Sequence, residues 1–129
     1  MIRVSLLGAG NVATHFFKAI KNAKDVSLVQ WYNRDLKKIT TFKNDVDIID
    51  DISNLSEADL YILAVSDAAI SDISASIPFE NKLVVHTSGS VNIHDLDKKN
   101  RRGVFYPLQT FSKDVPIDFQ KVPICIEAS

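Results

Sequence analysis

The chain has 129 residues, 46% of them hydrophobic, which suits one compact domain with its own core. Its net charge of -1, from 15 Lys and Arg against 16 Asp and Glu, lacks the concentrated positive charge of a nucleic-acid-binding protein, and no apolar run approaches the roughly 20 residues of a membrane helix. Because the start MIRVSLLG has no secretory signal and the single cysteine, Cys125, has neither a disulfide partner nor clustered zinc ligands, we expect a cytoplasmic domain without a metal, nucleic-acid or membrane partner.

Short apolar runs alternate with helical or polar segments, which favours a parallel sheet covered by helices. The run IRVSLL predicts a first strand over residues 2–7, and a helix follows from about Asn11 to Asn22. Residues 26–32, VSLVQWY, predict the second strand. A short helix then carries Leu36, Ile39 and Phe42 on one face, and VDII indicates a weaker third strand.

The second half of the chain continues this alternation. The uncharged run within ADLYILAVSD, residues 58–67, predicts a central strand buried on both faces. Ser66 or Asp67 can then cap a helix that runs towards Pro78. Further strands are expected in KLVVHTSGS, GVFYPLQTF and VPICIEA. The whole pattern predicts a doubly wound, mostly parallel α/β sheet with helices on both faces.

The turn after the first strand carries a phosphate-binding motif. GAGNVA matches G-x-G-x-x-A at Gly8, Gly10 and Ala13. In a dinucleotide-binding turn the first glycine permits the bend, the second lets a pyrophosphate approach the backbone, and the small third residue lets helix and strand pack closely. The alternative is a plain glycine turn. The strand before the motif and the helix after it favour the dinucleotide site.

The end of the second strand distinguishes the two nicotinamide dinucleotides. An NAD site places an acid there for the ribose 2'-hydroxyl, whereas an NADP site places an arginine nearby for the 2'-phosphate. YNRD offers Asn33 and Arg34 at this point, which favours NADP. NAD is the alternative, because Asp35 becomes the acid if the register differs by two residues.

A hydroxyl-rich turn, HTSGS, follows the fifth predicted strand. Parallel sheets bind ligands at this end of their strands, so Ser88 and His86 are the catalytic candidates, the histidine as a proton donor or acceptor. The alternatives are ordinary turn residues and a hydrogen-bonded, half-buried histidine. His15 and His94 are expected to be exposed, and their wide separation gives no metal spacing.

These segments together carry a family resemblance. GAGNVATHF, ADLYILAVSD, VVHTSGS and GVFYPLQTFS, in this order, resemble the N-terminal Rossmann domain of a bacterial family of NADP oxidoreductases with an uncharacterised substrate. That family is similar to the pyrroline-5-carboxylate reductase, prephenate dehydrogenase and beta-hydroxyacid dehydrogenase groups. The resemblance spans nearly all of the chain, and the pairing of HTSGS with YPLQTF is its most specific part.

The resemblance implies cofactor contacts along the whole site. The pyrophosphate would contact Gly8, Gly10, Asn11 and Val12, and the adenosine ribose with its phosphate would contact Asn33 and Arg34. Beyond the fourth strand the cofactor would pass Val65 and Ser66, and the nicotinamide would lie near Ser88 and Gly89.

The resemblance also implies a larger enzyme. Family members continue into a helical C-terminal domain that closes the substrate cleft and forms most of a homodimer. This sequence ends without such a domain, so we expect residues 1–129 to be the N-terminal, NADP-binding part of a longer oxidoreductase and to be inactive alone. The full enzyme would move hydride to or from a small carbonyl, imine or hydroxyl substrate. The alternative is a dinucleotide-binding module that senses redox state without catalysis.

Overall fold

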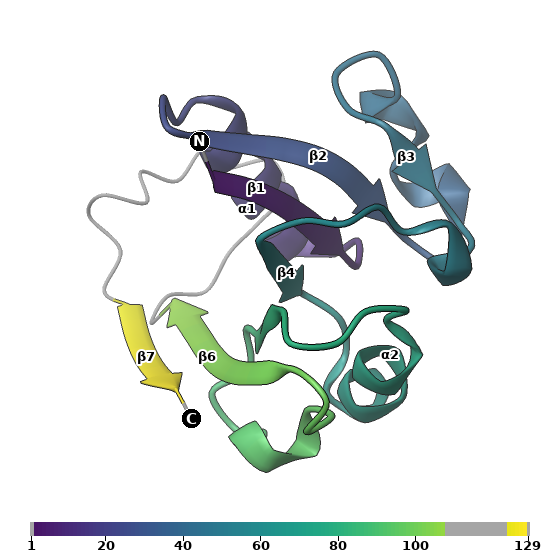
Figure 1. Ribbon diagram of the computed structural model, residues 1–129. Helices are drawn as coiled ribbons and strands as arrows, with labels where there is room; N and C mark the ends of the chain where they lie inside the picture. The colour runs from purple at the N-terminus through teal and green to yellow at the C-terminus, as the bar shows by residue number, and fades with distance from the viewer. Residues whose placement is uncertain (1, 108–123, 129) are drawn as a thin grey trace.

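A computed structural model describes residues 2–107 and 124–128 of the chain (Figure 1). Parts of two predicted strands, GVFYPLQTF and VPICIEA, lie outside the described residues. Seven strands form one sheet in the order β3-β2-β1-β4-β5-β6-β7. Their bounds are β1 Ile2–Leu7, β2 Val26–Tyr32, β3 Ile48–Ile49, β4 Leu60–Leu63, β5 Leu83–His86, β6 Arg101–Pro107 and β7 Ile124–Ala128.

The first six strands are parallel to their neighbours, and β7 runs antiparallel to β6. The order of these six strands is that of a Rossmann sheet, so the predicted fold class is confirmed. The chain leaves β1 towards β2 on one side and returns to β4 on the other. This reversal places a topological switch point between β1 and β4, where such sheets bind ligands.

Helices cover both faces of the sheet, as Figure 1 shows for α1 (Asn11–Lys21) and α2 (Ile70–Ser76). Successive strand residues point to opposite faces, so neighbours divide between two cores. Leu6 packs in the core beside α1, whereas Leu7 packs in the core beside α2. Both leucines are fully buried, which fixes the end of β1 between two helical layers.

Aromatic packing holds α1 against β2. The Phe17 and Trp31 rings stack with centroids 4.9 Å apart, and the Phe42 ring lies 4.6 Å from Phe17 and 5.1 Å from Trp31. The segment with Phe42 forms two 3-10 turns, Leu36–Lys38 and Thr40–Phe42, where the sequence predicted one short helix. The predicted Leu36, Ile39 and Phe42 face still packs against the α1 core.

Three local predictions need correction. The third strand is only Ile48–Ile49, shorter than VDII. Ser66 stands at the start of a 3-10 turn, Asp67–Ala69, but its side chain makes no capping hydrogen bond. The prediction that His15 is exposed is wrong, because α1 buries every residue from 13 to 17, a wider arc than its apolar stripe indicates. His94 is exposed, as expected.

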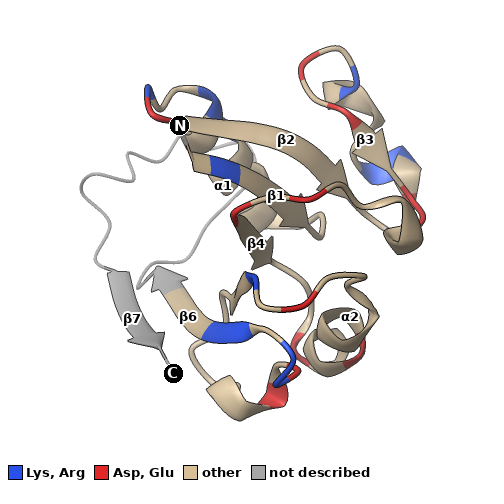
Figure 2. Ribbon diagram, in the orientation of Figure 1, with Lys and Arg blue, Asp and Glu red and all other residues tan. Residues whose placement is uncertain are grey.

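Acidic and basic residues are interspersed along the described chain (Figure 2). In the part of the sequence that the structure describes, no helix is long and apolar enough to cross a membrane.

Candidate dinucleotide site

A cavity of about 1220 Å³ opens at the carboxyl ends of the strands around the switch point. The turn after β1, the end of β2, and the loops after β4 and β5 form its walls. All ten residues predicted to contact a cofactor line it: Gly8, Gly10, Asn11, Val12, Asn33, Arg34, Val65, Ser66, Ser88 and Gly89. Segments distant in the sequence therefore meet at one ligand-sized cavity, in the place that the fold predicts.

The two glycines of the turn have different reasons to be glycine. Gly8 has a φ of +114°, and a Cβ there would collide with the backbone carbonyl of Ala64 on the neighbouring strand end. Gly10 has an extended φ of -137°, and a Cβ there would meet nothing within 4 Å. The fold thus requires a glycine at position 8 only. The open space beside Gly10 is what a pyrophosphate needs to approach the backbone.

The amino end of α1 faces the same space. Gly10 is its N-cap and offers no side-chain cap, and the first helical turn carries no acidic residue. Asn11 and Val12, the first two helical residues, line the cavity. The positive end of the helix dipole and its amide groups therefore favour an anion beside Gly10.

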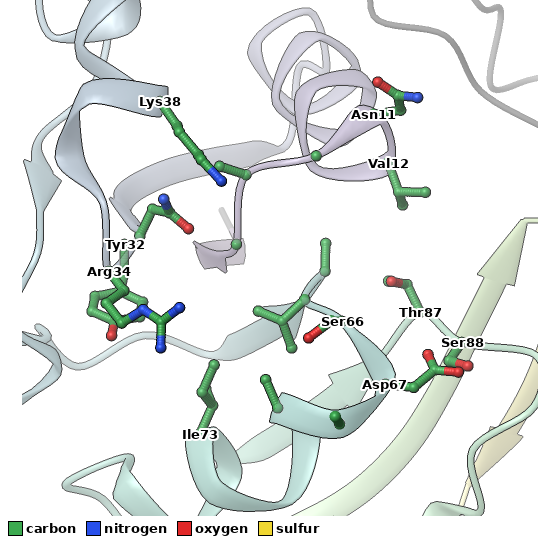
Figure 3. Close-up of a pocket in the computed structure, with 18 of the residues that line it drawn as sticks. Asn11, Val12, Tyr32, Arg34, Lys38, Ser66, Asp67, Ile73, Thr87 and Ser88 are labelled. Carbon is green, nitrogen blue, oxygen red and sulfur yellow. The ribbon is translucent and has the colours of Figure 1, made fainter.

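Cationic side chains stand at the β2 end of the cavity. Arg34 and Lys38 both line it, and Figure 3 shows their side chains on the same side as Tyr32. Asp35 does not line it: its carboxylate accepts a hydrogen bond from the Lys37 amide at 3.1 Å and caps the following 3-10 turn. The Asp35 carboxylate is therefore hydrogen-bonded within the following turn, whereas Arg34 lines the β2 end of the cavity.

Lys38 is a site residue that the sequence analysis missed. It follows Arg34 by four positions, and the 3-10 turn Leu36–Lys38 brings it back towards the cavity. The sequence signal for Lys38 was its spacing of four residues from Arg34. Such a spacing places two side chains on one face only where the chain is helical.

Hydroxyl groups and the Asp67 carboxylate line the opposite end. The Ser90 hydroxyl donates to the Asp67 carboxylate at 2.9 Å, and its oxygen lies 3.2 Å from that of Ser88. The Ser90 amide also donates to the Ser88 hydroxyl oxygen at 3.2 Å. Figure 3 shows Asp67, Thr87 and Ser88 together, across the cavity from Arg34 and Lys38. Asp67 was predicted from the sequence only as a possible helix cap, and its place in this cluster was not predicted.

His86 does not line the cavity. Its side chain is fully buried, and its Nδ1 accepts a hydrogen bond from the Ser88 amide at 3.1 Å. Its Nε2 has no hydrogen-bond partner among the described residues. Burial lowers the pKa of the imidazole below its ordinary 6.5. Of the two catalytic candidates, the structure brings Ser88 to the cavity and places His86 beneath it, where it holds the Ser88 backbone.

The described residues contain no cluster of His, Cys, Asp or Glu suited to a metal ion. Comparison with known proteins gives no match to a family model and none to a curated protein. Among solved structures, a Bacteroides fragilis protein named "putative NADP oxidoreductase" superposes with a TM-score of 0.89 at 34% identity, over 99% of this chain and 52% of that one. The family resemblance is confirmed.

Two further structures share the Rossmann fold at low identity. Prephenate dehydrogenase from A. aeolicus, solved with hydroxyphenyl propionate and NAD+, has a TM-score of 0.76 at 14% identity, over 98% of this chain and 50% of that one. An imine reductase from Pseudomonas sp. has a TM-score of 0.72 at 16% identity, over 97% of this chain and 46% of that one. This Rossmann domain therefore spans about half the length of each of these three solved proteins.

Proposed function

We propose that this Rossmann domain binds NADP(H) and belongs to an oxidoreductase that moves hydride to or from a small carbonyl, imine or hydroxyl substrate. The observation that carries the proposal is the β2 end of the cavity, where Arg34 and Lys38 stand and Asp35 is turned to a capping role. Two cations suit a 2'-phosphate, and a guanidinium can hold it through two hydrogen bonds.

The other walls fit the rest of the cofactor. The space beside Gly10 and the amino end of α1 would hold the pyrophosphate, and Val65 and Ser66 would line the path between the two ends. Ser88 and Gly89 would lie towards the nicotinamide, which supplies the hydride when bound. The Ser88 hydroxyl, held by Ser90 and by the His86 contact to its backbone, would orient the carboxamide or a substrate oxygen.

A titration tests the choice of cofactor. We expect the protein to bind NADPH more tightly than NADH, and Arg34→Ala to remove roughly tenfold to a hundredfold of that preference, because a hydrogen bond to a charged group contributes about 1.5 to 3 kcal/mol. Calorimetry or NADPH fluorescence measures both affinities. Lys37→Ala is the matched control, since Lys37 is an exposed cation on the same turn that does not line the cavity. Equal affinities in the unmodified protein would contradict the NADP assignment.

The helical partner domain, the homodimer and the inactivity of this chain alone stay predictions from the family resemblance. A closing domain would hold the substrate in attack geometry and exclude water, and these effects supply much of an enzyme's rate. We therefore propose that the chain binds NADPH without oxidising it in the presence of small keto acids, aldehydes or cyclic imines. Absorbance at the NADPH band tests this, and rapid turnover would show that the chain is catalytically complete.

A further inference from the structure

The only tryptophan of the sequence lies directly beneath the glycine turn. Trp31 is near the end of β2 and is fully buried. Its indole Nε1 donates a hydrogen bond to the Gly8 carbonyl at 2.6 Å, across 23 positions of sequence. A buried indole N–H needs an acceptor, but this acceptor belongs to the turn that borders the cofactor cavity.

Packing fixes the indole that makes this bond. The Trp31 ring stacks on Phe17 with 22° between planes and on Phe42 with 29°. Phe17 comes from α1 and Phe42 from the 3-10 turn that follows Lys38. The ring therefore has little freedom to turn its N–H away from Gly8, and no water reaches it to compete for the bond.

Gly8 is held at both of its polar groups by β2. Its amide donates to the Tyr32 carbonyl at 2.9 Å, and its carbonyl accepts from Trp31. The peptide that joins Gly8 to Ala9 is planar and trans, so its carbonyl and its amide point in opposite directions. Because the carbonyl points into the core at Trp31, the Ala9 amide points away from the core.

The Ala9 amide is available to a ligand. Ala9 lines the cavity between Gly8 and Gly10, and no group in the described part of the chain accepts a hydrogen bond from its amide. The turn therefore offers the Ala9 amide as a hydrogen-bond donor, and the bond from the Trp31 indole to the Gly8 carbonyl sets the direction of that amide.

We propose that Trp31 is a positioning residue for the pyrophosphate turn: its bond to the Gly8 carbonyl fixes the Gly8–Ala9 peptide so that the Ala9 amide meets the cofactor phosphate. This rests on the proposed dinucleotide function but not on the choice between NADP and NAD, because both carry the pyrophosphate. Fixing the donor before binding avoids the cost of ordering it during binding.

The test compares two ligands in two variants of the purified protein. Trp31→Phe keeps an aromatic ring and removes the N–H. We expect its affinity for NADPH to fall roughly threefold to tenfold, as for the loss of one hydrogen bond, and its affinity for adenosine 2'-monophosphate to stay unchanged. That ligand carries the 2'-phosphate for Arg34 and Lys38 but has no pyrophosphate.

Phe16→Leu is the matched control, because it removes a buried aromatic ring from the same α1 core, and that ring packs on Phe105 with centroids 5.5 Å apart rather than on the Trp31 indole. It should lower the melting temperature and leave the ratio of the two affinities as in the unmodified protein. An unchanged ratio in Trp31→Phe would overturn the positioning role, and so would an equal change of the ratio in both variants. Failure of the unmodified protein to bind either NADPH or NADH would overturn the proposed function together with this role.

A second measurement needs no substitution. A single indole N–H signal is expected in the proton–nitrogen NMR spectrum, since the chain has one tryptophan. We expect NADPH to shift this signal and adenosine 2'-monophosphate to leave it in place. If saturating NADPH leaves the signal unmoved, the positioning role is wrong, even where Trp31→Phe does not fold.

Discussion

The residues on the underside of the site and those on its open surface differ in what determines their identity. On the underside, Gly8 at the cavity floor and the buried Trp31 and His86 below it are set by contacts within the chain. These contacts are a close approach at a positive φ, an indole hydrogen bond and an imidazole that accepts from a backbone amide. On the open surface, Gly10 and Arg34 have no such internal reason for their identity. Substitutions on the underside should therefore alter stability first, whereas substitutions on the open surface should alter ligand binding alone.

The largest loss of stability is expected at the first glycine of the turn. We expect Gly8→Ala to cost about 2 to 6 kcal/mol of unfolding free energy, because the strained φ and the collision with the Ala64 carbonyl both oppose a Cβ. That is a large share of the roughly 5 to 15 kcal/mol of a small domain. Thermal or urea denaturation measures it. Gly10→Ala is the matched control and should change the unfolding free energy little, since its Cβ enters open space.

A larger side chain at the second glycine tests the open surface. Gly10→Val should fold normally and lose NADPH affinity by a hundredfold or more, because its methyl groups would fill the space proposed for the pyrophosphate. Its affinity for adenosine 2'-monophosphate should persist, as that ligand binds through the cationic end. Circular dichroism confirms the fold and calorimetry gives the affinities. Normal NADPH binding by this variant would mean that the glycine turn is only structural.

Lys38 should have a smaller effect, at the cationic end of the cavity. Lys38→Ala should weaken NADPH binding about fivefold and leave NADH binding unchanged, because a solvent-exposed ammonium contributes about 1 kcal/mol or less to a phosphate contact. Raising the salt concentration should shrink the difference. An equal loss in Lys37→Ala would show that general positive charge, rather than the place of Lys38 in the cavity, causes the effect.

The smallest expected effect concerns pH and the underside. Burial holds the pKa of folded His86 below 6.5, so the unfolded chain binds a proton that the folded chain does not. The contribution of His86 to stability is therefore fully present above pH 6.5 and is lost as the pH decreases through 6.5 towards the folded pKa. His86→Asn keeps an acceptor for the Ser88 amide without titrating in this range. Melting curves between pH 5.5 and 7.5 should fall less steeply for this variant, and parallel curves would contradict the assignment.

The parts of this structure that depend on the spacing of apolar residues or on the glycine motif were predictable from the sequence. The alternation of strands and helices predicted the mostly parallel sheet, and one motif with its spacing predicted the residues Gly8, Gly10 and Arg34, which line the cavity. Lys38 and Asp67 were missed because short turns, not regular helices, bring them to the cavity. Their placement depends on a few backbone angles that no periodic pattern encodes.

The burial of His15 was equally out of reach, whereas a hydrogen-bonded, half-buried His86 was one of the alternatives that the sequence left open. The polarity of His15 and His86 indicates a surface or a site, yet both are nearly inaccessible. His86 lies at the end of β5 with its ring beneath the chain, and the Ser88 amide satisfies its Nδ1. Whether a strand-end histidine points into a cavity or under it depends on the course of the following loop, which three-dimensional packing decides.

The bond between Ser90 and Asp67 ties the loop after β5 to the loop after β4. A second tie, from the Thr87 hydroxyl to the Leu63 carbonyl at 3.4 Å, joins the same two strand ends. The two loops at the far wall of the cavity are therefore linked by hydrogen bonds at two places. The near wall, in contrast, ends in the long exposed side chains of Arg34 and Lys38, which can change rotamer. A bound molecule would thus contact hydrogen-bonded loops at one end and long exposed side chains at the other. Differences in ligand length would be accommodated by rotamer changes at the cationic end.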